Sequence, residues 1–351
     1  MVKNTNKILL VVTWLILRNF QSTQLAAQEV PDVAGDGRSP HSSKSTPTTY
    51  FLIVGKGKVA DPTKQQERGK VAVSRVADAV RDSRPGIVVD AIAESVMTKE
   101  QYLREGAREK VTGAIFKERL EQLAATVTPE DTVVIYTHSH GRKNGFEESQ
   151  PLGGIVMDLP VRQPKHRGTL LWDEYVDLLL KIPAKNVAVL TMSCFSGGLV
   201  EYLNSPQVKD QWKDRREKEG RTLIVLTSQN KDLPSGPIVK DGEVINPFTY
   251  AVAKALSGEA DGFNLLGGNP KKPRKKDGKL AVGEMIDFVL HTTENTVSEV
   301  PRRGNNAKPK LTGSFDRGDV LSFGVKAPAD DPETKKTAQQ DAATDADKPR
   351  R

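Results

Sequence analysis

Residues 187–197 read Val-Ala-Val-Leu-Thr-Met-Ser-Cys-Phe-Ser-Gly, an apolar run that ends in small residues around Cys194, the only cysteine of the chain. Upstream, residues 133–141 read Val-Val-Ile-Tyr-Thr-His-Ser-His-Gly and end in a similar way at His140 and Gly141. Such runs are typical of strands that are buried on both faces of a parallel sheet. They predict neighbouring strands that carry a thiol and an imidazole just beyond their carboxyl ends, where ligands bind in such sheets.

Strands and helices alternate through the central part of the chain. The sequence predicts strands at residues 50–54, 87–89, 132–137, 187–190 and 222–227, and helices at residues 71–81, 100–126, 170–182, 248–256 and 281–290. This alternation predicts an α/β fold, a three-layer sandwich with a mostly parallel central sheet and helices on both faces.

The first 27 residues have the pattern of a signal peptide. Lysines lie at positions 3 and 7, residues 8–17 are almost entirely apolar, and Leu25-Ala26-Ala27 offers a small-residue cleavage site. Ten residues are too few to span a bilayer comfortably, so we expect no stable membrane anchor. The sequence therefore predicts an exported protein, periplasmic or secreted.

Composition divides the rest of the chain into a domain and two flanking segments. Residues 28–47 are rich in Pro, Ser, Gly and Asp, which predicts a disordered linker. Residues 326–351 contain no aromatic side chain and are highly charged, which predicts a disordered tail. The folded domain is expected to cover residues 48–325.

Charge and composition favour neither a nucleic acid nor a metal as a partner. The net charge is +7, but the basic residues are scattered apart from one cluster at residues 271–276, and no aromatic residues interleave with that cluster. A single cysteine excludes an internal disulfide and a cysteine-rich metal site. The five histidines form no recognisable zinc-ligand grouping apart from His138 and His140, which would need further ligands, and no segment resembles a calcium loop. We expect no cofactor.

The residues around Cys194 and His140 are suited to nucleophilic catalysis. A thiolate attacks a carbonyl carbon, and an imidazole delivers a proton to the leaving group. Gly141 lets a substrate carbonyl approach the main chain, so its N–H and that of Cys194 are predicted to form an oxyanion hole. His138 still lies within the strand, and we interpret it as a packed, hydrogen-bonded histidine.

These two motifs resemble the caspase-like superfamily of cysteine peptidases, which includes caspases, metacaspases and legumains. Its signature is an apolar strand that ends in His-Gly, followed by a second strand that ends in a small residue and a cysteine. The separation of His140 and Cys194 is 54 residues (194 − 140), in the order that the family shows. Weaker similarity is found at residues 222–228, 246–249 and 309–314.

The resemblance covers roughly residues 48–325, and it implies a cysteine endopeptidase. Such an enzyme hydrolyses peptide bonds of a peptide or protein substrate through a Cys-His dyad and an acyl-enzyme intermediate, without a cofactor. The resemblance also implies maturation by cleavage in exposed loops, and residues 209–221 and 271–279 are the candidates. Solvated loops without any processing are an equally good interpretation of both segments.

One position departs from the family pattern. The residue two before the cysteine helps to form the primary specificity pocket, and here it is Met192 rather than an acidic residue or Gln. A thioether does not pair with a basic side chain, so specificity for Arg or Lys is in doubt, unless Asp232 supplies the charge. Ser228, which ends the segment resembling the strand after the cysteine, is a further candidate for substrate binding.

Two other functions remain open from the sequence. A caspase-like domain can serve as a binding or scaffold module with little catalysis, and the unusual Met192 is compatible with that role. A cysteine-dependent α/β-hydrolase acting on esters is less favoured, because it needs a small residue in place of Met192 and a histidine after the nucleophile. The only such histidine, His291, lies in or beside a predicted helix. The oligomeric state does not follow from the sequence.

Overall fold

The computed structural model describes eleven ranges of the chain, all within the compact unit Thr46–Arg351. They are residues 47–56, 68–81, 86–93, 111–145, 152–157, 169–240, 243–266, 269–270, 276–299, 308–317 and 319–324. The predicted signal peptide and tail lie outside the described residues, as does the predicted linker except for its last residue.

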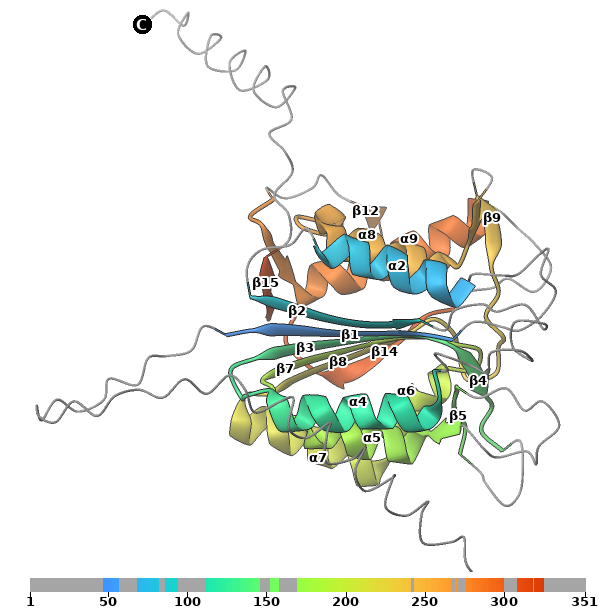
Figure 1. Ribbon diagram of the computed structural model, residues 1–351. Coiled ribbons are helices and arrows are strands. Elements are labelled where there is room, and N and C mark those ends of the chain that lie inside the picture. The colour runs from blue at the N-terminus through green and yellow to red at the C-terminus, as the bar shows by residue number, and fades with distance from the viewer. Residues whose placement is uncertain are drawn as a thin grey trace, which may run out of the picture. The chain divides into compact units, whose positions relative to one another are not determined.

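A six-stranded sheet forms the middle layer of the structure (Figure 1). Its strand order is β14-β8-β7-β3-β1-β2. Five strands are parallel, and β14 pairs with β8 in the antiparallel direction at one edge. The strands are β1 (Thr49–Gly55), β2 (Ile87–Ala93), β3 (Thr132–His138), β7 (Asn186–Met192), β8 (Thr222–Thr227) and β14 (Lys310–Ser314).

Helices cover both faces of this sheet (Figure 1). One face packs against α2 (Arg68–Arg81), α8 (Pro247–Lys254) and α9 (Val282–Glu299). The opposite face packs against α4 (Gly113–Thr126), α5 (Trp172–Lys181), α6 (Gly197–Leu203) and α7 (Pro206–Glu219). The predicted fold class is confirmed: the protein is an α/β three-layer sandwich with a mostly parallel central sheet.

The central strands form because their side chains alternate between two apolar cores. In β7, Ala188, Leu190 and Met192 face the core under α2, α8 and α9, whereas Val187 and Val189 face the core on the other side. Every residue of β3 and β7 is buried. Full burial of a side chain such as Leu or Val contributes about 1.5–3 kcal/mol, so burial of these strands contributes strongly to the stability of the sheet.

Short strands form smaller sheets around the main one. A three-stranded antiparallel sheet is made of β4 (His140–Arg142), β5 (Gly154–Val156) and β6 (Thr169–Leu171). Three two-stranded ribbons pair six further strands: β9 (Ile238–Lys240) with β10 (Glu243–Ile245), β11 (Leu265–Leu266) with β12 (Asn269–Pro270), and β13 (Lys279–Ala281) with β15 (Val320–Gly324). A π-helical turn, η1 (Ala255–Glu259), follows α8.

The prediction of an exposed loop at residues 209–221 was wrong. Most of this segment belongs to α7, which begins with Pro206 at its first turn and ends at Gly220 in the left-handed conformation. Both residues are typical helix boundaries, and Val208 and Trp212, one turn apart, bury its inner face. The other predicted cleavage segment, residues 271–279, lies mostly outside the described residues.

Helix boundaries also differ from the prediction. The helix expected at residues 100–126 begins at Gly113, because Thr112 is extended and caps it, and residues 100–110 lie outside the described residues. The helix expected at residues 170–182 begins at Trp172, because the residues before it form β6. The helix expected to end at residue 290 continues to Glu299.

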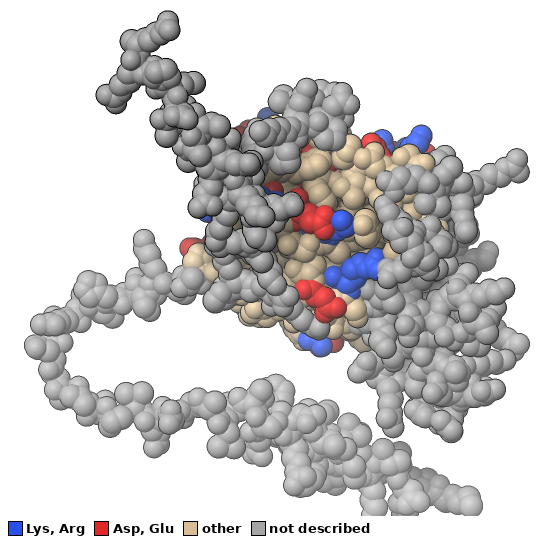
Figure 2. Space-filling view, turned by 90° about the horizontal axis from the view of Figure 1, so that it is seen from above, with Lys and Arg blue, Asp and Glu red and all other residues tan. Residues whose placement is uncertain are grey.

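Charged side chains on the described part of the surface are mixed in sign. On the face that is covered by α2, α8 and α9, Figure 2 shows basic and acidic side chains close to one another without a continuous patch of either sign. Among the described helices, none has the length and apolar character needed to cross a bilayer.

Candidate active site

The two sequence motifs lie side by side at the carboxyl edge of the sheet. Strands β3 and β7 are parallel neighbours, and their last registered pair is His138 with Met192. Beyond the strands, the Ser139 N–H donates to the Met192 carbonyl oxygen at 3.0 Å. Strands β3 and β7 therefore end at the same position along the sheet. His140 follows the end of β3 by two residues, and Cys194 follows the end of β7 by two residues.

Gly141 lies directly against the main chain of Cys194. A Cβ atom built at position 141 would overlap the Cys194 carbonyl oxygen and would lie 2.7 Å from its carbonyl carbon. Real Cβ atoms do not approach backbone atoms so closely, so only glycine fits here. Gly141 belongs to β4 and pairs with Ile155 of β5, which fixes its position relative to the turn at Cys194. The predicted proximity of the His-Gly and Cys motifs is present in the structure.

Cys194 begins a strained turn between β7 and α6. The next residue, Phe195, has a φ of +57°, the only positive φ of a non-glycine residue in the described part of the chain. A bulky side chain rarely adopts this left-handed conformation, and such strain is found preferentially at functional sites. The Phe195 N–H donates to the Leu233 carbonyl oxygen at 3.0 Å, which holds the turn in place.

The turn packs tightly because two glycines follow it. A Cβ at Gly197 would lie 2.5 Å from the Lys231 nitrogen, and a Cβ at Gly198 would lie 2.7 Å from the Trp172 indole nitrogen. The two glycines form the first turn of α6.

The sulfur of Cys194 contacts the backbone of Ser235. The Ser235 N–H donates to Sγ at 3.2 Å, and Sγ lies 3.6 Å from the Ser235 carbonyl oxygen. The thiol is half-buried and is not in a disulfide. Ser235 is therefore a direct neighbour of the proposed nucleophile.

The Ser235 side chain bridges Met192 and Asn246. Its Oγ donates to Met192 Sδ at 3.5 Å and accepts a hydrogen bond from Asn246 Nδ2 at 3.1 Å. Asn246 is also the N-cap of α8, where its Oδ1 accepts from the N–H groups of Phe248 and Thr249. The N-terminus of α8 thus anchors the segment that contacts Cys194.

Ser228 has a structural position below the turn. It is 1% exposed, and its Oγ lies 3.2 Å from both the nitrogen and the carbonyl oxygen of Ser193. It also lies 3.4 Å from Ser196 Oγ. These contacts connect the end of β8 to Ser193, which precedes Cys194, and to Ser196, which follows it. The Ser228 hydroxyl therefore stabilises the turn that contains Cys194.

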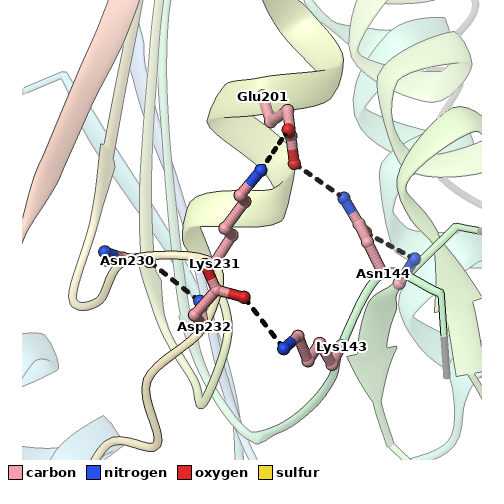
Figure 3. A network of polar contacts seen from close by, with 7 residues as sticks. Lys143, Asn144, Glu201, Asn230, Lys231 and Asp232 are labelled. Atoms are coloured by element: carbon pink, nitrogen blue, oxygen red, sulfur yellow. Dashed lines mark hydrogen bonds and ion pairs between the residues drawn. The ribbon is translucent and has the colours of Figure 1, made fainter.

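Asp232 lies in a surface network rather than beside Met192 as a free acid. Its carboxylate pairs with Lys143 at 2.9 Å, and this hydrogen bond holds the pKa of the Asp232 carboxyl below its ordinary value. Next to it, Lys231 pairs with Glu201 at 2.5 Å, and Glu201 also accepts from Asn144 at 3.2 Å (Figure 3). Asn144 Oδ1 in turn accepts from the Gly153 N–H at 2.7 Å.

This network joins three segments around the site. Lys143 and Asn144 follow β4, Glu201 belongs to α6, and Lys231 and Asp232 precede Ser235 (Figure 3). The ion pairs therefore connect the ends of both sequence motifs to the segment that contacts Cys194.

His138 is packed and hydrogen-bonded, as its place in the strand predicts. It is 7% exposed, and its Nδ1 lies 3.4 Å from Thr249 Oγ1 and 3.5 Å from the Tyr136 hydroxyl. The hydroxyl oxygens of Tyr136 and Thr249 are hydrogen-bonded to each other at 2.6 Å. Burial raises the pKa of the Tyr136 hydroxyl well above its ordinary value. This cluster ties β3 to α8 beneath the site.

Other groups offer no competing centre in the described part of the chain. His291 on α9 is hydrogen-bonded to Asn295 at 2.8 Å and contacts the ring of Phe263. No group of three or more His, Cys, Asp and Glu side chains among the described residues is arranged to hold a metal ion.

Comparison with known proteins gives a distant likeness among solved structures. No protein-family model and no curated protein matches the chain. Among solved structures, it is similar to protein GSU0716 from Geobacter sulfurreducens, with 15% identity and a TM-score of 0.43. That alignment covers 77% of this chain and 95% of the other. At this level of likeness, nothing about the chemistry of Cys194 follows from it.

Proposed function

We propose that this protein is a caspase-like cysteine endopeptidase in which Cys194 and His140 form the catalytic dyad. The observation that supports the proposal most strongly is the contact between Gly141 and Cys194. Position 141 has room only for glycine against the Cys194 carbonyl group, so the backbone next to His140 lies against the backbone of the only cysteine. The three-layer architecture with a mostly parallel sheet is also the one that the family resemblance implies.

In the proposed reaction, the Cys194 thiolate attacks the scissile carbonyl carbon and forms a tetrahedral intermediate. The N–H groups of Gly141 and Cys194 bind the oxyanion. Among the hydrogen bonds of the described residues, none uses the Cys194 backbone N–H, which is compatible with this role.

His140 then acts as general acid and base. It protonates the nitrogen of the leaving amine as the C–N bond breaks, which leaves a thioester on Cys194. It next takes a proton from water, the resulting hydroxide attacks the thioester, and the C–S bond breaks to release the acid product and the thiolate. No oxidant, reductant or metal enters this sequence of steps.

Export of the enzyme belongs to the same proposal. The apolar residues 8–17 and the small residues 25–27 support cleavage of a signal peptide, which would place a peptidase in the periplasm or outside the cell. N-terminal sequencing of the protein recovered from its natural compartment tests this point, and a mature chain that retains residue 1 would contradict it.

Labelling with a thiol-reactive peptide electrophile tests the dyad. We expect rapid modification of Cys194 and a loss of at least tenfold in rate in His140→Ala. His291→Ala is the matched control, because this half-buried histidine on α9 is hydrogen-bonded to Asn295. A peptide-library cleavage assay with Cys194→Ala as the blank then tests hydrolysis.

The labelling experiment can also exclude the dyad. A thiol that reacts slowly, at the same rate with and without the His140 side chain, would exclude the dyad and favour a binding or scaffold module.

A further inference from the structure

The thiol of Cys194 is held by the backbone of a segment that is distant in sequence. The Ser235 N–H donates to Sγ at 3.2 Å, and the Ser235 carbonyl oxygen lies 3.6 Å from the same sulfur. A thiol is both a weak acceptor and a weak donor, so one sulfur can make both contacts at once. The place of Sγ beyond β7 therefore depends on where the backbone of Ser235 lies.

Ser235 belongs to a segment without regular structure. Residues 233–237 lie between β8 and β9 and form neither a helix nor a strand. Because no ladder of backbone hydrogen bonds sets the position of Ser235, other contacts have to do so. The Leu233 carbonyl oxygen, which accepts from the Phe195 N–H at 3.0 Å, holds one end of the segment.

The Asn246 side chain holds the segment from the other side. Its Nδ2 donates to Ser235 Oγ at 3.1 Å and to the Gly236 carbonyl oxygen at 3.5 Å. Its Oδ1 accepts from the N–H groups of Phe248 and Thr249 at 3.1 and 3.2 Å. Since these two donors require an oxygen, the amide nitrogen has to point toward Ser235.

Asn246 is anchored because α8 is packed into the core. Phe248 is 1% exposed, and the Thr249 hydroxyl is hydrogen-bonded to the Tyr136 hydroxyl of β3 at 2.6 Å. Helix α8 is thereby tied to the strand that leads to His140. The Asn246 amide therefore has a fixed place relative to the carboxyl edge of the sheet.

Capping of α8 alone does not require asparagine. Asp, Ser and Asn are N-caps of about equal strength. Among them, only asparagine has both an acceptor for the helix and two N–H donors on the same planar group. Those donors are the ones that contact Ser235 and Gly236.

We propose that Asn246 is a positioning residue for Cys194, and that it acts through Ser235 by holding the backbone that contacts the thiol. The inference rests on the proposed peptidase function, since the direction of the sulfur matters when it has to reach the carbonyl carbon of a bound peptide. Among the hydrogen bonds of the described residues, none joins Asn246 to the sulfur directly, so its effect passes through Ser235.

Asn246→Asp removes the donors and keeps the cap. Aspartate supplies an acceptor for α8, but its carboxylate cannot donate to Ser235 Oγ or to the Gly236 carbonyl oxygen. Cys194 of the full chain is labelled with a peptide electrophile and, separately, with iodoacetamide, which needs no alignment with a bound peptide. We expect the ratio of the peptide-probe rate to the iodoacetamide rate to fall at least tenfold. An unchanged ratio would overturn the inference.

Thr112→Ala is the matched control, because it removes the side-chain cap of another helix. Thr112 Oγ1 accepts from the Ile115 N–H at 3.1 Å at the start of α4, which packs on the opposite face of the sheet. We expect the ratio to stay within twofold of the wild-type value, whatever the loss of stability in urea. A fall as large as that in Asn246→Asp would assign the effect to a weakened helix and overturn the inference.

A double-mutant cycle tests whether Asn246 acts through Ser235. Ser235→Ala removes Oγ but keeps the backbone N–H that contacts the sulfur, and we expect it to lower the ratio at least threefold. Residues that act through one contact have non-additive effects. The variant with both changes should therefore have the ratio of Asn246→Asp alone. A ratio lowered by the product of the two single effects, or no effect of Ser235→Ala, would contradict the route through Ser235.

His140→Ala in the same assay separates this inference from the proposed function. A wild-type ratio that does not change in His140→Ala contradicts the dyad, and the iodoacetamide rate alone then tests the positioning. We expect Asn246→Asp to raise that rate several-fold relative to Thr112→Ala, because the sulfur is no longer held against Ser235. Equal iodoacetamide rates in the two variants would then overturn the positioning as well.

Discussion

His138 and Met192 face each other in the last registered pair of two parallel strands. Every pair in this ladder, from Thr132 and Asn186 onward, is separated by the same 54 residues of sequence. His140 and Cys194 have this separation as well, because each follows its strand by two residues. The register of the sheet therefore explains why a fixed interval in the sequence brings the two motifs together in space.

Replacing Gly141 by alanine tests the contact between the two motifs. The added Cβ would overlap the Cys194 carbonyl oxygen, so the turn or β4 must shift. We expect a loss of about 1–3 kcal/mol in the free energy of unfolding, which is the usual cost of overpacking, and slower labelling of Cys194. Urea denaturation and labelling kinetics measure the two effects.

Gly145→Asn is the matched control for Gly141→Ala. Gly145 lies in the turn just after β4, no atom lies within 4 Å of a Cβ built there, and its φ of +69° suits asparagine. Equal effects of the two substitutions would show that the contact with Cys194 is not the cause.

Replacing Ser228 by alanine should destabilise the protein without any direct effect on a substrate. The buried hydroxyl satisfies the Ser193 N–H, and an unpaired buried group costs about 1–3 kcal/mol. Ser257→Ala removes an exposed serine hydroxyl that bonds to Lys254, and we expect a change within about 0.5 kcal/mol. Urea denaturation measures both variants, and equal stabilities would contradict the structural role.

Alkaline pH should destabilise the fold through its buried tyrosines. Burial raises the pKa of Tyr136 and of Tyr175, so both phenols stay neutral in the folded protein when unfolded tyrosines ionise. Their contribution is complete below a pH of about 10 and is lost as the pH rises above it, by about 1.4 kcal/mol per pH unit for each residue.

The variants Tyr136→Phe and Tyr175→Phe isolate this effect. Each should show a shallower decrease in stability between pH 10 and pH 11 than the wild type, measured by urea denaturation at a series of pH values. Parallel pH profiles for the three proteins would show that the phenols are not responsible.

Neutralising Glu201 should loosen the segment that contacts Cys194. Glu201 pairs with Lys231 and accepts from Asn144, and exposed ion pairs of this kind weaken with salt. We expect Glu201→Gln to raise the rate of Cys194 modification by iodoacetamide several-fold, and we expect added NaCl to have the same effect on the wild type.

A second exposed pair serves as the comparison for Glu201. Glu217 pairs with Lys213 one turn earlier on α7, so Glu217→Gln removes a similar interaction from another surface. An increase in labelling that is the same in both variants would indicate a general loosening rather than one at the site.

The fold could be predicted from the sequence because its central strands are continuous apolar runs. Residues 133–135 and 187–190 have no polar side chain, and such runs are typical of strands that are buried on both faces of a parallel sheet. The sheet of β4, β5 and β6 could not be predicted, because strands of three residues are too short to show the alternation of apolar and polar side chains that indicates a strand. For α7, Pro206 and Gly220 are typical helix boundaries and indicated a helix. The many charged residues between them favoured an exposed loop instead, so the helix was not predicted.

Only part of the candidate site could be predicted from the sequence. Cys194, His140 and Gly141 could be identified because each ends an apolar strand. Ser235 and Asn246 could not, since the contact of Ser235 with the cysteine is made by its backbone and spans 41 residues of sequence. No residue type is required for such a contact, so the sequence carries no trace of it.

Phe195 imposes a trade-off between thermal stability and reactivity on the turn after Cys194. Its left-handed backbone costs about 1–3 kcal/mol, and glycine at this position would remove that cost. Directed evolution for heat resistance alone should therefore select glycine at position 195, because stabilising changes at strained functional sites are available at the expense of activity. The resulting protein would survive higher temperatures with Cys194 held less rigidly.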